Sequence, residues 1–84
     1  SRYKKLIEHD YFVVGIPDHR LGEKLVLLIE GKETALMLGK IDEFHKNLND
    51  AIPKYEIPKE IFFINTFIRT QTGKINRSQS LQLL

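Results

Sequence analysis

A glycine–lysine pair near the carboxyl end is the feature of this sequence best suited to chemistry. Gly73 and Lys74 lie in a hydrophilic segment that also contains Thr72, and Arg69 and Arg77 flank them. A lysine ammonium is a compact charge on a flexible stem, so it can reach a phosphoryl oxygen. The flanking arginines make the local field positive. The segment is therefore suited to act as a mobile arm that brings a cation to a phosphate, although most isolated glycine–lysine pairs simply mark turns.

Spacing excludes two common kinds of site. A P-loop needs a glycine five residues before its second glycine and a Ser or Thr after the lysine, and this chain has Ile68 and Ile75 at those positions. None of the three histidines, His9, His19 and His45, has a second histidine three or four residues away. The chain contains no cysteine, which removes thiolate ligands and thiol nucleophiles. We therefore predict no metal site.

The composition is typical of one small soluble domain. The 84 residues carry 13 Lys and Arg against 11 Asp and Glu, a net charge of +2, and 42% are hydrophobic. A disordered tail would have fewer apolar residues and more net charge, and a surplus of two charges is too small to indicate nucleic-acid binding. The longest apolar run, from Leu25 to Ile29, is far shorter than the roughly 20 residues of a spanning helix. We expect a cytoplasmic protein that does not enter a membrane.

Two strands are expected in the first third of the chain, as antiparallel neighbours. Residues 11–16 and 23–30 are rich in the aromatic, branched and other apolar side chains of buried strands. Pro17 and Asp18 favour a turn after the first strand, and the link is too short for a crossover helix. Residues 3–9 have apolar side chains at helical spacing and are expected to form the end of a helix.

One amphipathic helix is expected after these strands. Thr34 is the candidate N-cap, and Pro53 stops the helix. Gly39 lies inside the pattern and costs about 1 kcal/mol relative to alanine, so a start near Lys40 is the alternative. The apolar face recurs at steps of four and three residues, through Met37, Ile41, Phe44, Leu48 and Ala51.

A third strand and a short helix complete the expected fold. Residues 60–65 follow Pro58 and are apolar on both faces. The order strand, helix, strand favours a right-handed crossover and a parallel pairing. Residues 78–84 resume apolar spacing at Leu81 and Leu84, which predicts a short terminal helix. The fold class is therefore α+β, a small three-stranded mixed sheet with helices packed on it.

Three segments resemble motifs of the mobile C-terminal domain of adenylate-forming enzymes. This superfamily includes acyl-CoA synthetases, nonribosomal peptide adenylation domains and luciferases. Residues 12–24 (FVVGIPDHRLGEK) resemble its V-V-G-x-P-D-x-x-x-G-E motif, residues 53–59 (PKYEIPK) its P-x-Y-x-x-P-x linker, and residues 69–77 (RTQTGKINR) its R-T-x-T-G-K-I-x-R loop. The motifs occur in the family's order and spacing and span nearly the whole chain. The resemblance implies a C-terminal lid domain.

The resemblance also implies a two-step reaction. A carboxylate attacks the α-phosphate of ATP to give an acyl-adenylate and pyrophosphate, and a thiol, usually that of CoA, then displaces AMP. By similarity, Lys74 is the catalytic lysine that enters the active site for the first step, where a positioned cation stabilises charge on the phosphoryl oxygens. Gly73 allows the tight turn, and Thr72 and Arg69 are the accompanying nucleotide-binding candidates. The domain then rotates and withdraws this loop.

The chain departs from the family's pattern at a few positions. Phe67 and Ile68 stand where Leu-Pro is frequent, and Gln71 stands where the family often has proline. Neither change removes the lysine or its glycine. Ile57 replaces a basic residue that some CoA ligases place near the CoA nucleotide. Tyr55 is a candidate for stacking on the adenine of CoA, with a role in the core as the alternative.

The resemblance implies a larger protein around this chain. In these enzymes ATP and Mg²⁺ are bound mainly by a large N-terminal domain, whose motifs do not occur in residues 1–84. We therefore expect residues 1–84 to be a single truncated C-terminal domain that begins within its first helix. Its partners are expected to be its own N-terminal domain, a carboxylic acid and CoA, and the fragment alone is expected to be inactive.

The sequence also leaves alternatives for the substrate and for the class of protein. Residues 61–70 and the short tail after Arg77 are similar to the o-succinylbenzoate–CoA ligases of menaquinone synthesis. Another acyl-CoA synthetase or a peptide-synthetase adenylation domain is the alternative. Outside this class, a small basic nucleic-acid-binding module remains, although the chain has neither a KH-type Gly-x-x-Gly nor an RRM-type signature. Salt-dependent binding of oligonucleotides separates the classes, and we expect none.

Overall fold

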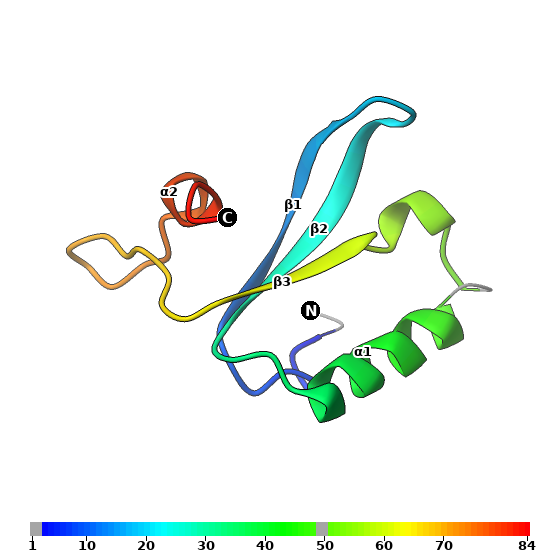
Figure 1. The fold of residues 1–84 in the computed structure, drawn as a ribbon, viewed down its shortest axis with the longest axis horizontal. Helices are drawn as coiled ribbons and strands as arrows, with labels where there is room; N and C mark the ends of the chain where they lie inside the picture. The colour runs from blue at the N-terminus through cyan, green and yellow to red at the C-terminus, as the bar shows by residue number, and fades with distance from the viewer. Residues whose placement is uncertain (1–2, 49–50) are drawn as a thin grey trace.

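The chain forms a three-stranded sheet with a helix on each side. The computed structural model describes residues 3–48 and 51–84, so the expected helical positions 49 and 50 lie outside the described residues. Figure 1 shows the elements in chain order, which are β1 (Tyr11–Asp18), β2 (Gly22–Glu30), α1 (Ala35–Leu48), the 3₁₀ helix η1 (Lys54–Glu56), β3 (Glu60–Ile64) and α2 (Arg77–Leu81).

β2 is the central strand of the sheet. It pairs antiparallel with β1, where Tyr11 lies opposite Ile29, and parallel with β3, where Val26 lies opposite Glu60. The strand order is therefore β1-β2-β3. This confirms the mixed sheet expected from the sequence, because a short link can only make a hairpin whereas the segment containing α1 is long enough to cross over to a parallel strand.

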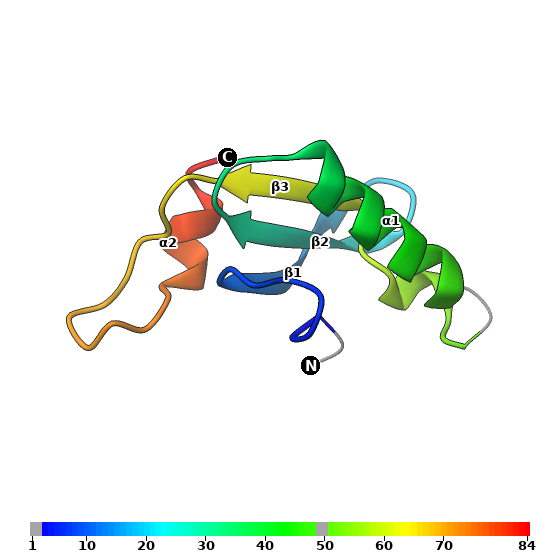
Figure 2. The ribbon, with the colours of Figure 1, turned by 90° about the horizontal axis from the view of Figure 1, so that it is seen from below.

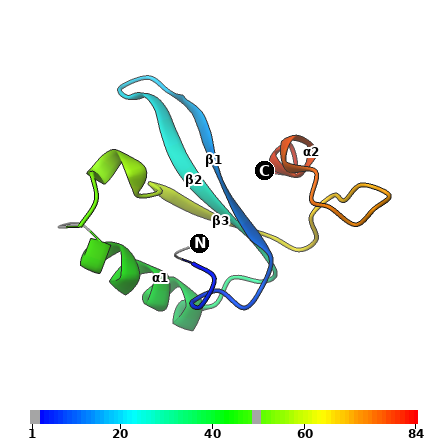
Figure 3. The same cartoon turned by 180° about the vertical axis from the view of Figure 1, so that it is seen from behind.

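Two hydrophobic clusters lie on opposite faces of the sheet. Successive side chains of β2 enter different clusters, because side chains alternate between the two faces of a strand. The buried residues of the α1 side are Tyr3, Ile7, Leu27, Ile29 and Ile41. The buried residues of the α2 side are Phe12, Val26, Leu28, Ile64 and Phe67. Figures 2 and 3 show the sheet lying between α1 and α2, so each helix covers its own face.

α1 begins where the capping chemistry predicts. The Thr34 Oγ1 accepts a hydrogen bond from the Met37 amide at 3.1 Å, which confirms Thr34 as the N-cap. The alternative start near Lys40 is wrong, since the helix runs from Ala35. Ala51, which the spacing predicts on the apolar face, lies in an exposed turn beyond the helix. The helical pattern in the sequence therefore extends further than the helix itself.

Residues 3–6 form a turn and residues 7–9 contain no helix, so the predicted end of a helix is wrong. The amides of Leu6 and Ile7 both donate to the Tyr3 carbonyl, at 2.9 and 2.8 Å. Tyr3 and Ile7 are nevertheless buried, and the Tyr3 hydroxyl makes a 2.7 Å hydrogen bond with the Nε2 of His45 on α1. The predicted apolar face is correct although the helix is not, because a single turn is enough to bring two side chains four residues apart to the same side.

The turn between β1 and β2 begins two residues later than the sequence pattern predicts. Pro17 and Asp18 belong to β1, and the turn comprises residues 19–21. The Asp18 carboxylate accepts hydrogen bonds from the amides of Arg20 and Leu21, at 3.1 and 2.9 Å. Asp18 therefore shapes the turn from its first flank, as aspartates commonly do.

α2 is short and is joined to the preceding segment through its one buried residue, Ser80. The Asn76 side chain caps its start by accepting an amide of the first turn at 3.0 Å. Ser80 is fully buried, and its Oγ accepts the Ile68 amide at 2.9 Å. Leu84 is 54% exposed, so the apolar spacing after Leu81 does not lead to burial. Neither of the two α-helices in the described residues is long and apolar enough to cross a membrane.

Candidate functional site

Lys74 lies in a short hairpin formed by residues 69–75, hereafter called the lysine hairpin. Arg69 and Ile75 form an antiparallel bridge at its base. The Thr70 amide donates to the carbonyl of Lys74 at 2.8 Å. The expected arm is therefore a hydrogen-bonded hairpin, with an order that the hydrophilic composition did not predict.

Gly73 makes the turn at the tip of the lysine hairpin. Its φ is +87°, a conformation that side chains other than glycine rarely adopt, and its amide donates to the Thr70 carbonyl at 2.9 Å. A Cβ at this position would meet nothing within 4 Å, so the backbone conformation, and not lack of space, requires glycine. The Thr70 hydroxyl accepts the Lys74 amide at 3.2 Å and lies 3.0 Å from the Thr72 hydroxyl.

The Lys74 ammonium is available to a ligand. Residues 70–74 are all exposed, and Figures 1 and 2 show this segment projecting away from the sheet on the α2 side. Among residues 3–48 and 51–84, no ion pair involves Lys74, whereas Lys24, Lys46 and Arg69 each pair with a carboxylate. The hairpin therefore presents an unneutralised cation at the outer limit of the fold.

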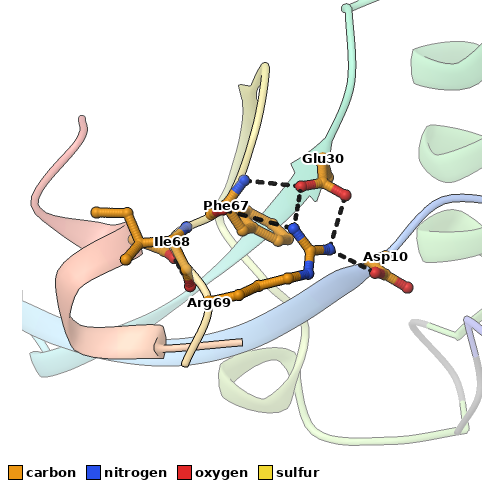
Figure 4. A network of polar contacts seen from close by, with 6 residues as sticks. Asp10, Glu30, Phe67, Ile68 and Arg69 are labelled. Atoms are coloured by element: carbon orange, nitrogen blue, oxygen red, sulfur yellow. Dashed lines mark hydrogen bonds and ion pairs between the residues drawn. The ribbon is translucent and has the colours of Figure 1, made fainter. Parts of the chain in front are cut away.

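Arg69, at the base of the lysine hairpin, is held by two carboxylates. Its two terminal nitrogens donate to the two oxygens of Glu30 at 2.7 and 2.9 Å, and one of them also donates to Asp10 at 2.6 Å. The amide of Phe67 donates to the same Glu30 carboxylate at 2.7 Å. Figure 4 shows the guanidinium of Arg69 lying between Glu30 and Asp10. These contacts tie the hairpin to the ends of β1 and β2.

The network around Arg69 perturbs both partners of the ion pair. The Arg69 guanidinium and then the Phe67 amide lower the pKa of Glu30 from 4.5 to about 2. Hydrogen bonds to Glu30 and then to Asp10 raise the pKa of Arg69 above its usual range. Both groups are therefore charged over the whole range in which proteins usually work.

The depressed pKa of Glu30 predicts a loss of stability in acid. Because the folded state binds this proton more weakly than the unfolded chain, the contribution is complete above pH 4.5 and is lost as the pH falls towards 2. Urea unfolding at a series of pH values is expected to show a smaller loss across this window in Glu30→Gln. Glu33→Gln, at an exposed position outside the ion pairs of the described residues, is the control. Equal acid sensitivity in Glu30→Gln and the unaltered chain would contradict the assignment.

The candidate residues fall into two places. Arg69, Thr72, Gly73 and Lys74 lie together in the lysine hairpin, whereas Tyr55 lies in η1. Figures 1 and 3 show η1 and the lysine hairpin at opposite ends of the molecule. Tyr55 is 70% exposed, so its alternative role in the core is wrong. The nucleotide-binding roles of Arg69 and Tyr55 stay predictions, and in this structure the Arg69 nitrogens bind carboxylates.

Glu30 and Asp10 are site residues that sequence reasoning missed. Glu30 follows the apolar run 25–29 at the end of β2 and Asp10 directly precedes β1, so both lie where the sheet meets its connections. A charged residue at the end of a buried strand was the available signal for Glu30. Its partner was not predictable, because Arg69 lies 39 residues further along the chain.

Comparison with known proteins places this arrangement in a family. The family described as the AMP-binding enzyme C-terminal domain matches residues 9–74. The chain is 32% identical over 68 residues to 3-oxocholest-4-en-26-oate--CoA ligase from Rhodococcus rhodochrous, covering 77% of this chain and 11% of that protein. It is 33% identical over 75 residues to VraA from Staphylococcus aureus (strain MRSA252), covering 84% of this chain and 15% of that protein.

A solved structure shares both the fold and part of the sequence. It is the acyl-CoA synthetase (AMP-forming)/AMP-acid ligase II-like protein from Dyadobacter fermentans DSM 18053, with a TM-score of 0.79 and 31% identity. The match covers 98% of this chain and 23% of that one, so the chain spans less than a quarter of each of these three relatives. The family match covers most of the chain, from before β1 to Lys74. The chain therefore belongs to the family of AMP-binding enzyme C-terminal domains.

Proposed function

We propose that this chain is the C-terminal lid of an ATP-dependent acid–thiol ligase, with its own N-terminal domain as partner, in the cytoplasm. The ligase activates a carboxylic acid as acyl-adenylate and transfers the acyl group to CoA. Lys74 is the residue that enters the active site for the first step. The family membership of residues 9–74 and the printed activity of the relative from Rhodococcus rhodochrous support this proposal.

The exposed, unneutralised Lys74 ammonium is the observation that carries the proposal. Charge builds up on the α-phosphoryl oxygens as the carboxylate attacks and pyrophosphate leaves, so a cation placed there stabilises the transition state more than the ground state. A lysine already paired with a carboxylate would lose that ion pair on entering the active site. Lys74 has no such partner among the residues described, and Gly73 and Thr72 shape the turn that presents it.

The remaining ligands are assigned mainly to other parts of the protein. Within residues 3–48 and 51–84, no three His, Cys, Asp or Glu side chains are grouped so that they could hold a metal ion. We propose that the N-terminal domain holds Mg²⁺ and most of ATP. Tyr55, exposed on η1, is proposed to stack on the adenine of CoA.

For the acid, we propose o-succinylbenzoate, which would make the protein a ligase of menaquinone biosynthesis. The similarity of residues 61–70 to that group of ligases supports this choice. The relatives suggest other acids, since one of them is named for 3-oxocholest-4-en-26-oate. A long-chain fatty acid is a further comparator within the same reaction class.

The test compares residues 1–84 with the longer protein that contains them. Pyrophosphate release and CoA thioester formation are measured with ATP, Mg²⁺, CoA and each of the three acids. The longer protein is expected to form a thioester with o-succinylbenzoate in preference to the steroid and fatty acids, and residues 1–84 alone are expected to release no pyrophosphate. Preference for another acid would show that the assignment of o-succinylbenzoate is wrong. Pyrophosphate release by residues 1–84 alone would show that the role as a lid is wrong.

A further inference from the structure

The Glu30 carboxylate connects the central strand of the sheet to the base of the lysine hairpin. Its Oε2 accepts from the Nη1 of Arg69 at 2.7 Å, its Oε1 accepts from the Nη2 at 2.9 Å, and its Oε2 also accepts the Phe67 amide at 2.7 Å. A guanidinium and a carboxylate joined by two parallel hydrogen bonds have a fixed relative orientation. Glu30 therefore sets both the position and the direction of the chain where the hairpin begins.

Glu30 is itself mounted on the most buried part of the fold. It is the last residue of β2, and the four residues before it, 26–29, are 0% exposed. It lies opposite Ile64 in the parallel pairing with β3, and the next amide, of Gly31, donates to the Ile64 carbonyl at 2.8 Å. A side chain on a paired, buried strand is held more rigidly than one on a loop. The sheet therefore provides a firm support for the carboxylate.

The support reaches Lys74 through the backbone of the hairpin. Arg69 is bridged to Ile75, the residue after Lys74. Just outside the hairpin, the Asn76 amide donates to the Ile68 carbonyl at 2.7 Å. In the part of the chain that the structure describes, no hydrogen bond or ion pair joins Glu30 to Lys74, so any influence passes through Arg69 and the backbone.

We infer that Glu30 is a positioning residue for Lys74, an inference that rests on the function proposed above. By holding Arg69, Glu30 fixes the direction in which the hairpin projects, so rotation of the whole domain is enough to bring the ammonium to the α-phosphate. A loosely held hairpin would reach the same point in only a fraction of its conformations, and a misplacement of about 1 Å can cost on the order of 100-fold in rate.

The test uses Glu30→Gln in the longer protein that contains this chain. The glutamine keeps the shape of the side chain but loses the charge and one acceptor. We expect kcat for pyrophosphate release to fall by at least about tenfold with little change in the KM for ATP, because the ammonium is displaced only from its transition-state position. Thioester formation from supplied acyl-adenylate is expected to stay unchanged, and Glu30→Asp, which keeps the charge, is expected to recover part of the loss.

Glu60→Gln is the matched control. Glu60 pairs with Lys24 across the same two strands, β2 and β3, but at the opposite end of their pairing. Its loss is expected to leave both half-reactions within about twofold of the unaltered protein, as for a surface ion pair. Hydrogen exchange gives a readout independent of activity, in which the Thr70 and Asn76 amides are expected to exchange at least about tenfold faster in Glu30→Gln, with the amides of β2 unchanged.

Each outcome of these measurements has a definite meaning. If Glu30→Gln changes neither pyrophosphate release nor the exchange of the hairpin amides, or slows both half-reactions equally, the positioning role is wrong and the proposed function stands. If Lys74→Ala in the same assay leaves pyrophosphate release intact, the proposed function is wrong and the positioning role falls with it. If Glu30→Gln also speeds hydrogen exchange at the β2 amides, the variant has disturbed the sheet, and Arg69→Lys is used in its place. Arg69→Lys is then expected to slow pyrophosphate release and to leave thioester formation from supplied acyl-adenylate unchanged.

Discussion

Replacing Lys74 by alanine is expected to slow acyl-adenylate formation by about two to three orders of magnitude, the loss typical of removing one group that stabilises developing charge. The reason is that Lys74 is exposed, unpaired among the described residues and presented by an ordered hairpin. The rate of pyrophosphate release in the longer protein measures this step. Thioester formation from supplied acyl-adenylate is expected to survive, because the proposed function has the domain rotate and withdraw the lysine hairpin before that step.

Lys40→Ala is the control for the Lys74 substitution. Lys40 is also an exposed lysine, but it lies on α1, on the other face of the sheet. Its removal changes the net charge by the same amount, so it separates a local effect from a general change in the field around the protein. Equal losses in both half-reactions of Lys74→Ala, or equal losses in the two variants, would contradict the role assigned to Lys74.

Phe67→Ala is expected to destabilise the domain by about 3–5 kcal/mol, the usual cost of deleting a buried phenylalanine. Phe67 is 3% exposed, and the centroid of its ring lies 5.1 Å from the centroid of the Phe12 ring in the cluster on the α2 side. A domain of 84 residues has a free energy of unfolding of about 4–13 kcal/mol, so this loss takes much of the total. Urea unfolding of the chain at neutral pH is the measurement.

Two variants show whether the loss comes from the buried ring. Phe67→Leu places at this position the residue that the family often has, and it is expected to cost less than about 1.5 kcal/mol if the site repacks. Tyr55→Ala removes a ring that is 70% exposed, so little change in the free energy of unfolding is expected. A Phe67→Ala variant as stable as Tyr55→Ala would show that the cluster does not anchor the segment leading to the lysine hairpin.

Local patterns in the sequence correctly predict most of the elements and their pairing. The short link after β1 requires a hairpin, and Thr34 provides the cap from which α1 starts. The errors fall where the pattern is short or ambiguous. Residues 3–9 have the apolar spacing of a helix but form only a turn over residues 3–6, and Ala51 continues the helical spacing after α1 has ended at Leu48.

The lysine hairpin shows the boundary between sequence and structure most clearly. From the sequence alone, Lys74, Gly73 and their basic neighbours are recognisable, because short-range chemistry and a contiguous motif identify them. Only the tertiary structure decides that Arg69 is bound to Glu30 and Asp10, which lie 39 and 59 residues away along the chain. Such a contact depends on which strands pair and in which register, and these are set by the packing of the whole chain rather than by any segment of it.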